Sequence, residues 1–293
     1  MMREKKKPPP IFMGRIHGGM NSHGPIPWHV GIGYGSGKHF KYHCGGVIVD
    51  ELTILSAANC WKPNIKDTLY VLAGKFLVDD PHAHFKVKEA ILYENRTYAS
   101  KSYKHDIVIF KLQEPLKFRK HLRKVCLPDK DFDFSKVKKC WISGWGKMKL
   151  GQGYENGLKP SDTSPKILQW TSIPLLNNSY CQMRHTETSM MHPIQITDHH
   201  LCAGYTSHKL NPDTCAGDDG GPLICSETNS PDNVVLVGII SEYKTCGRYL
   251  PGLYTNVVPY LDWIHKNLVS FILTKTRKSF KRFGKNLLPF SIL

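Results

Sequence analysis

Short apolar runs separated by turn residues make up most of the chain. Such runs occur at residues 45–57 (GGVIVDELTILSA), 69–74 (LYVLAG), 105–112 (HDIVIFKL) and 234–242 (VVLVGIISE). They are rich in Val, Ile and Leu and are bounded by turn residues, which is typical of β-strands joined by short connections. The pattern therefore predicts an all-β fold with many short strands.

One segment near the end of the chain has a different periodicity. Leu261, Ile264, Leu268 and Phe271 with Ile272 recur at helical spacing, which predicts an amphipathic C-terminal α-helix. Beyond it, lysine and arginine alternate with phenylalanine and leucine, and Gly284 and Pro289 would interrupt any helix there. The sequence contains no run of 18 or more apolar residues of the kind that predicts a transmembrane helix.

The composition of the chain indicates the cellular compartment in which it folds. The 293 residues are 41% hydrophobic, enough for one large all-β domain or two small ones. Nine cysteines indicate an oxidising compartment, and the absence of C-x-x-C argues against a zinc ribbon or a thioredoxin-like site. The start, MMREKKKPPPIFMGR, has no apolar region of a signal peptide. We therefore expect an extracellular protein whose signal peptide is not in this sequence; unconventional export is the alternative.

The charge of the chain suggests one class of partner. A net charge of +16 favours polyanions, namely acidic glycans, anionic membranes or, nonspecifically, nucleic acid, whereas the simpler alternative is a basic but inert surface. No motif indicates specific nucleic-acid binding, and the oligomeric state stays open. Basic residues are concentrated in residues 117–124 and in the tail, and the candidate polyanion-binding residues are Lys117, Arg119, Lys120, Arg123, Lys124, Lys278, Lys281 and Arg282.

Several motifs occur in an order that points to a known family. They are RIHGG, HCGGVIV, LSAANCW, HDIVIFKL, CWISGWG, LCAGY, GDDGGP and PGLYTNVVPYLDWI. Over residues 16–266 the chain resembles the trypsin-like serine proteases of the chymotrypsin family. This resemblance implies two six-stranded antiparallel β-barrels, with the catalytic site between them and a C-terminal α-helix. Residues 1–15 would be a basic leader or propeptide remnant, and residues 267–293 a basic amphipathic tail.

The catalytic positions depart from the family pattern. The resemblance places Asn59 at the histidine position, Asp106 at the aspartate position and Asp219 at the serine position. An amide does not accept a proton near neutral pH, and a carboxylate beside the oxyanion-hole amides of Gly217 and Asp219 would oppose developing negative charge. We expect a non-catalytic homologue that acts as a binding or regulatory protein. An attacking aspartate and residual endopeptidase activity are less favoured alternatives.

The resemblance also implies a substrate pocket and an activation switch. The pocket positions are Asp213, Ser241, Tyr243 and Gly252, and Tyr243 would crowd the wall that normally receives a peptide. Cleavage after Arg15 would free the ammonium group of Ile16 to pair with Asp218. A solvated basic leader is the alternative for Arg15.

The remaining expectations concern covalent features and ligands. The resemblance implies the disulfides Cys44–Cys60, Cys140–Cys225, Cys181–Cys202 and Cys215–Cys246, which leave Cys126 over. Asn95 and Asn177 begin N-x-S/T sequons and are candidate glycosylation sites. We expect no cofactor and no metal site, and we expect a protein partner.

Overall fold

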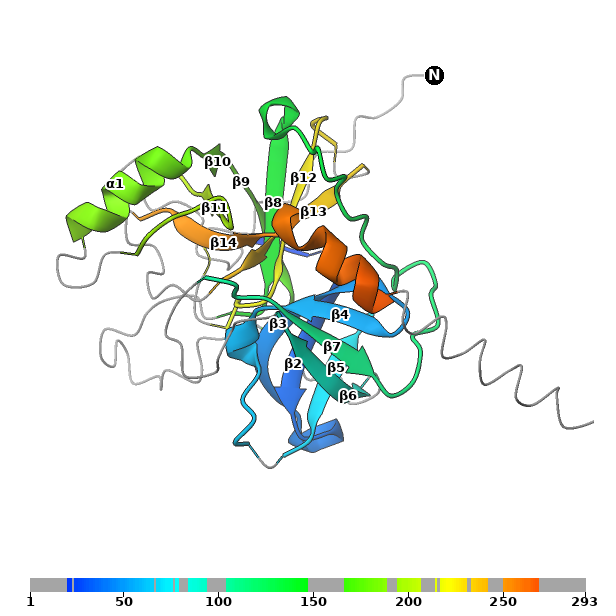
Figure 1. Cartoon of the computed structure of the whole chain (residues 1–293). Coiled ribbons are helices and arrows are strands. Elements are labelled where there is room, and N and C mark those ends of the chain that lie inside the picture. Colours follow the sequence, from blue (N-terminus) through cyan, green and yellow to red (C-terminus); the bar gives the residue numbers. More distant parts are fainter. Residues whose placement is uncertain are drawn as a thin grey trace, which may run out of the picture.

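The structure is a computed structural model. It describes residues 20–22, 24–65, 67–75, 77–78, 84–93, 104–146, 166–188, 194–206, 214, 217–230, 233–241 and 250–268. Within these ranges the chain forms two antiparallel sheets that lie one above the other in Figure 1. The prediction of an all-β fold is confirmed.

The first sheet is a closed six-stranded barrel. Its strand order is β2-β3-β4-β7-β6-β5, and every neighbouring pair is antiparallel. Strands β2, β4 and β7 are buried along their whole length, which explains why none of them shows the apolar–polar alternation of a half-buried strand. The strands are β2 (His29–Tyr34), β3 (Lys41–Asp50), β4 (Thr53–Ser56), β5 (Leu69–Ala73), β6 (His84–Leu92) and β7 (Val108–Leu112).

The second sheet has eight strands, in the order β1-β9-β8-β12-β13-β14-β11-β10. The six inner strands are those that the family resemblance implies, and a two-residue strand is added at each edge. The strands are β1 (Met20–Asn21), β8 (Lys139–Gly144), β9 (Gln169–Ile173), β10 (Leu175–Leu176), β11 (His200–Ala203), β12 (Pro222–Ser226), β13 (Val235–Ile240) and β14 (Gly252–Asn256).

Helical structure is sparse in the described residues. The 3₁₀ turns are η1 (Gly37–His39), η2 (Ala58–Cys60), η3 (Phe134–Lys136) and η5 (Val258–Tyr260). Residues 261–268 form the expected C-terminal helix, drawn in orange in Figure 1. The second helix, α1 (Asn178–Thr188), is not predicted by the apolar pattern. It begins where the Asn177 Oδ1 accepts a hydrogen bond from the Ser179 N–H at 2.7 Å.

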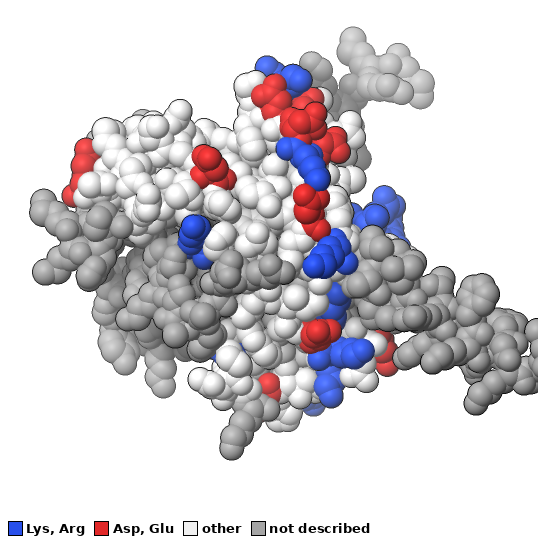
Figure 2. Space-filling model, viewed as in Figure 1, with Lys and Arg blue, Asp and Glu red and all other residues white. Residues whose placement is uncertain are grey.

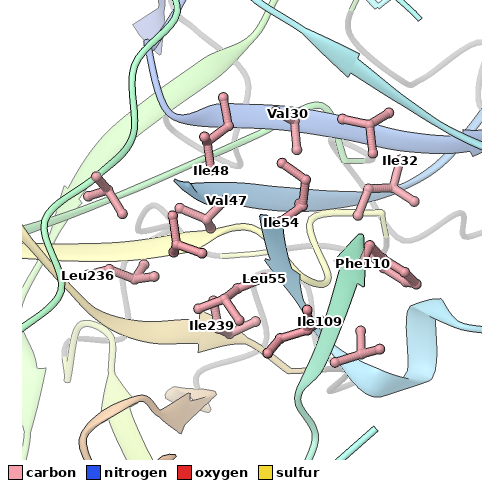
Figure 3. Packing of buried hydrophobic residues seen from close by; sticks show 14 of the residues in the cluster. Val30, Ile32, Val47, Ile48, Ile54, Leu55, Ile109, Phe110, Leu236 and Ile239 are labelled. Carbon is pink, nitrogen blue, oxygen red and sulfur yellow. The ribbon is translucent and has the colours of Figure 1, made fainter. Parts of the chain in front are cut away.

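The largest apolar cluster joins the two sheets. Ile48, Ile54 and Phe110 of the barrel are fully buried, and Leu236 and Ile239 of strand β13 belong to the same cluster. Figure 3 shows these side chains close to one another between the strands. Because one core holds both sheets, the segments that contribute candidate site residues from each sheet are fixed relative to one another.

A buried histidine adds a polar contact between the sheets. The Nδ1 of His29 lies 2.7 Å from the Oγ of Ser143, and the imidazole meets the Trp145 ring edge-on with 5.0 Å between centroids. Burial lowers the pKa of His29 from 6.5 to about 3. His29 is therefore neutral in the native state at mildly acidic pH.

This histidine makes the stability of the fold depend on pH. Below pH 6.5 the unfolded His29 takes up a proton that the native one refuses until about pH 3, so stability falls as the pH drops through this window. Between pH 7 and about pH 4.5 we expect a loss of roughly 2–3 kcal/mol from this residue. In denaturant unfolding, the free energy of unfolding of His29→Gln should therefore fall by roughly 2–3 kcal/mol less than that of the wild type over this pH range. Equal pH profiles for the wild type and His29→Gln would contradict the assignment.

Three of the four expected disulfides are present. They join Cys44 to Cys60, Cys140 to Cys225, and Cys181 to Cys202. Cys215 and Cys246 lie outside the described residues. Cys126 is exposed and is not disulfide-bonded.

Candidate functional site

The carboxylate of Asp106 is buried and held from two sides. Its Oδ1 accepts the backbone N–H of Asn59 at 3.0 Å, and its Oδ2 accepts the hydroxyl of Ser241 at 2.6 Å. The Asp106 carbonyl oxygen accepts the Thr255 hydroxyl at 2.8 Å. Asp106 is 1% exposed, so its orientation is set by these bonds and not by water. Ser241, assigned to the pocket from the sequence, therefore also positions this carboxylate.

Asn59 and Asp219 are brought to the same place from opposite sheets. Asn59 lies in the 3₁₀ turn η2, directly after strand β4, whereas Asp219 lies in the turn before strand β12. The Sγ of Cys60 is 3.6 Å from the Asp219 carbonyl oxygen, which also accepts the Gly45 N–H at 2.7 Å. Asn59, Asp106 and Asp219 thus lie in adjoining segments, as the resemblance implies for a catalytic triad.

The side chain of Asp219 turns back onto its own loop. The Gly217 N–H donates to the Asp219 Oδ2 at 3.4 Å. Gly217 has a φ of 98°, a conformation that glycine adopts without a Cβ penalty. Of the two amides expected to form an oxyanion hole, one therefore points at a carboxylate of the chain itself. A negative charge placed there opposes the charge that develops during acyl transfer.

Tyr42 is a residue of this site that the sequence did not indicate. Its hydroxyl donates to the Gly217 carbonyl oxygen at 2.6 Å, and its ring meets Trp145 edge-on at 5.8 Å. Burial and the negative charges of Asp218 and Asp219 raise the pKa of Tyr42 well above its usual value of 10.0. The phenol therefore stays protonated and fixes the peptide that follows Gly217. A tyrosine two residues before Cys44 carries no sequence signal for this contact.

Asp218, the expected partner of a new N-terminus, is buried in the loop before strand β12. It is 2% exposed, and its Oδ1 accepts the Gly146 N–H at 2.8 Å. A Cβ on either Gly144 or Gly146 would overlap this carboxylate, so both glycines of the CWISGWG segment are needed for its close approach. Arg15 and Ile16 lie outside the described residues. The activation switch stays a prediction.

Other sequence-predicted positions fall partly outside the described residues. Gly252 begins strand β14 and is buried, whereas Asp213 and Tyr243 are outside. Asn177 is exposed at the start of helix α1, and Asn95 is outside. Lys278, Lys281 and Arg282 of the tail are also outside.

Among the described residues, no group of three or more His, Cys, Asp or Glu side chains could hold a metal ion. In the same part of the chain, no helix is long and apolar enough to cross a membrane.

The fold and the order of these positions agree with the comparisons to known proteins. The protein-family model described as "Trypsin" matches residues 16–264. The chain belongs to the trypsin family.

One relative gives a scale for this similarity. Coagulation factor XI of Bos taurus is 33% identical over 256 residues, a match that covers 85% of this chain. The same match covers 37% of the relative, so the chain spans well under half of that protein's length.

Proposed function

We propose that this chain is a non-catalytic member of the trypsin family that acts by binding another protein. The observation that carries the proposal is the hydrogen bond from the Gly217 N–H to the Asp219 carboxylate, at 3.4 Å. The donor that would stabilise an oxyanion is directed at a carboxylate of the chain itself, and that carboxylate stands at the position of the nucleophile.

The histidine position supports the same conclusion. Asn59 keeps the backbone contact to Asp106 at 3.0 Å, so the main chain retains an arrangement suited to an oriented proton shuttle. Its amide side chain does not take up a proton near neutral pH, whereas an imidazole does. Loss of either the serine or the histidine lowers turnover on the order of 10⁶-fold, and loss of both costs about the same. Binding is then the function that the retained fold can still perform.

We also propose that the protein acts outside the cell. Three disulfides among the described residues are typical of proteins that fold in an oxidising compartment. A glycan at the exposed Asn177 is compatible with its capping role, because the hydrogen bond to Ser179 uses Oδ1 and leaves Nδ2 for the sugar.

A fluorophosphonate probe tests the proposal, because it labels a serine activated by a neighbouring base. We expect no labelling of the purified wild-type chain, and no hydrolysis of Lys or Arg peptides, under conditions that label an active trypsin completely. The assay should be repeated after limited cleavage with an immobilised trypsin-like protease. Stoichiometric labelling, or turnover that persists after repurification, would overturn the proposal.

A further inference from the structure

The segment of residues 116–125, which packs on the first barrel, carries a concentrated positive charge. In residues 116–125, the apolar side chains of Leu116, Leu122 and Val125 are buried, with exposed fractions of 2%, 3% and 3%. The cationic side chains between them are all exposed, and they are Lys117, Arg119, Lys120, Arg123 and Lys124. The apolar residues thus anchor the segment while the cations face the solvent.

Backbone hydrogen bonds fix the shape of this segment. Arg119 and Leu122 exchange two N–H···O bonds of 2.9 Å each, so residues 119–122 form a tight turn. The Arg123 N–H donates to the Pro27 carbonyl and the Val125 N–H to the Ile48 carbonyl, both at 2.9 Å. Since the backbone is already ordered on the barrel, a ligand that binds these cations orders only their side chains.

The charge of the segment is not balanced by acidic residues within the segment itself. Residues 113–125 contain five Lys or Arg side chains and one acid, Glu114, which leaves a net charge of +4. The ion pairs found among described residues involve Lys130, Lys136 and Arg184 instead. Glu51 lies at one end, where its carbonyl accepts the Leu116 N–H at 2.8 Å. Figure 2 shows lysine and arginine side chains in a broken line down the right of the described surface, with acidic side chains between them.

The composition of the surface favours a sulfated glycan over a membrane. Phe118, 38% exposed, is the single large apolar side chain that the segment presents to solvent. Interfacial binding to a bilayer draws on a broad apolar face as well as on charge. Oxyanion groups spaced along a polymer instead match an array of ammonium and guanidinium groups on an ordered turn. We propose that residues 117–124 bind a sulfated polysaccharide of the heparin class.

This site is separate from the triad positions, and the proposal does not depend on the absence of catalysis. The test measures binding of the full chain to heparin across a range of salt concentrations. We expect the triple variant, in which Lys117, Lys120 and Lys124 are all changed to Gln, to bind heparin roughly tenfold or more weakly near physiological salt. It should also reduce the slope of log K against log salt by about two to three, because fewer counterions are released.

The matched control removes the same charge elsewhere. Lys38, Lys41 and Lys138 are also exposed, and changing all three to Gln should alter heparin affinity less than about threefold. Both triple variants should unfold at the wild-type denaturant concentration, which excludes loss of fold. An equal loss in both variants would assign binding to net charge and overturn the proposal. It would also be overturned if only Lys278→Gln, Lys281→Gln and Arg282→Gln together abolished binding. Tighter binding to phosphatidylserine vesicles than to heparin, lost in the first variant, would overturn it in favour of a membrane.

Discussion

The double variant Asn59→His with Asp219→Ser is expected to react with a fluorophosphonate probe, whereas either single variant is not. The reason is that the third member of the site is in place. The Asp106 carboxylate is buried and bonded to the Asn59 N–H and the Ser241 hydroxyl, so an imidazole at position 59 would be oriented by it. Replacing Asp219 also frees the Gly217 N–H that its carboxylate now accepts.

The expected effect is large and non-additive. A triad lacking its base or its nucleophile is about as slow as one lacking both, so we expect a gain of at least about 10³-fold only when both groups are restored. The measurement is the rate of probe labelling, before and after limited cleavage with an immobilised trypsin-like protease. Adding Asp106→Asn to the double variant should lower that rate roughly 10⁴-fold, because the imidazole loses its orienting carboxylate. A folded double variant that stays unlabelled in both states would show that more than the two side chains has been lost.

Gly220→Ala is expected to destabilise the fold by roughly 3–4 kcal/mol. Gly220 has a φ of 80°, and a Cβ there would overlap the Ser56 hydroxyl and the Gly45 carbonyl oxygen. Its N–H also donates to the Ile240 carbonyl at 2.8 Å, so the loop is tied to strand β13 and has little room to shift. Backbone strain and overlap therefore add.

Gly37→Ala provides the control for this prediction. Gly37 also has a positive φ, 56°, but a Cβ there would meet no atom within 4 Å. Gly37→Ala should therefore lower the free energy of unfolding only by the backbone strain, about 1 kcal/mol. Guanidinium unfolding of both variants measures the difference, and equal costs would contradict the close packing of Gly220 against the first barrel.

The positions of the site were predictable because the motifs place them. HDIVIFKL contains the buried strand β7, with Asp106 two residues before it, and GDDGGP is a turn that requires Gly220, so the family resemblance of these motifs implied which groups meet. The hydrogen bonds within the site could not be predicted from the sequence. Loop geometry decides that the Asp219 carboxylate accepts a hydrogen bond from the Gly217 N–H. Tyr42 belongs to the site because its hydroxyl donates to the Gly217 carbonyl oxygen, 175 residues later in the sequence.

The features of the fold that the sequence did not predict also have physical explanations. Helix α1 has few apolar residues, and it is stabilised by the Asn177 cap and the Cys181–Cys202 disulfide in place of an apolar face. The two-residue strands β1 and β10 are too short to show an alternating pattern. A lone histidine in an apolar run, such as His29, gives no indication that its partner is Ser143 on the other sheet.

The shape of the two sheets limits how a partner can be held. The first barrel is closed, and the second sheet ends on strands of only two residues at both sides. An added peptide strand needs a long row of unpaired backbone groups to extend a sheet. Neither described sheet offers such a row, so we expect a bound peptide to be recognised through side chains and connecting segments, where a substitution alters specificity without disturbing the strands.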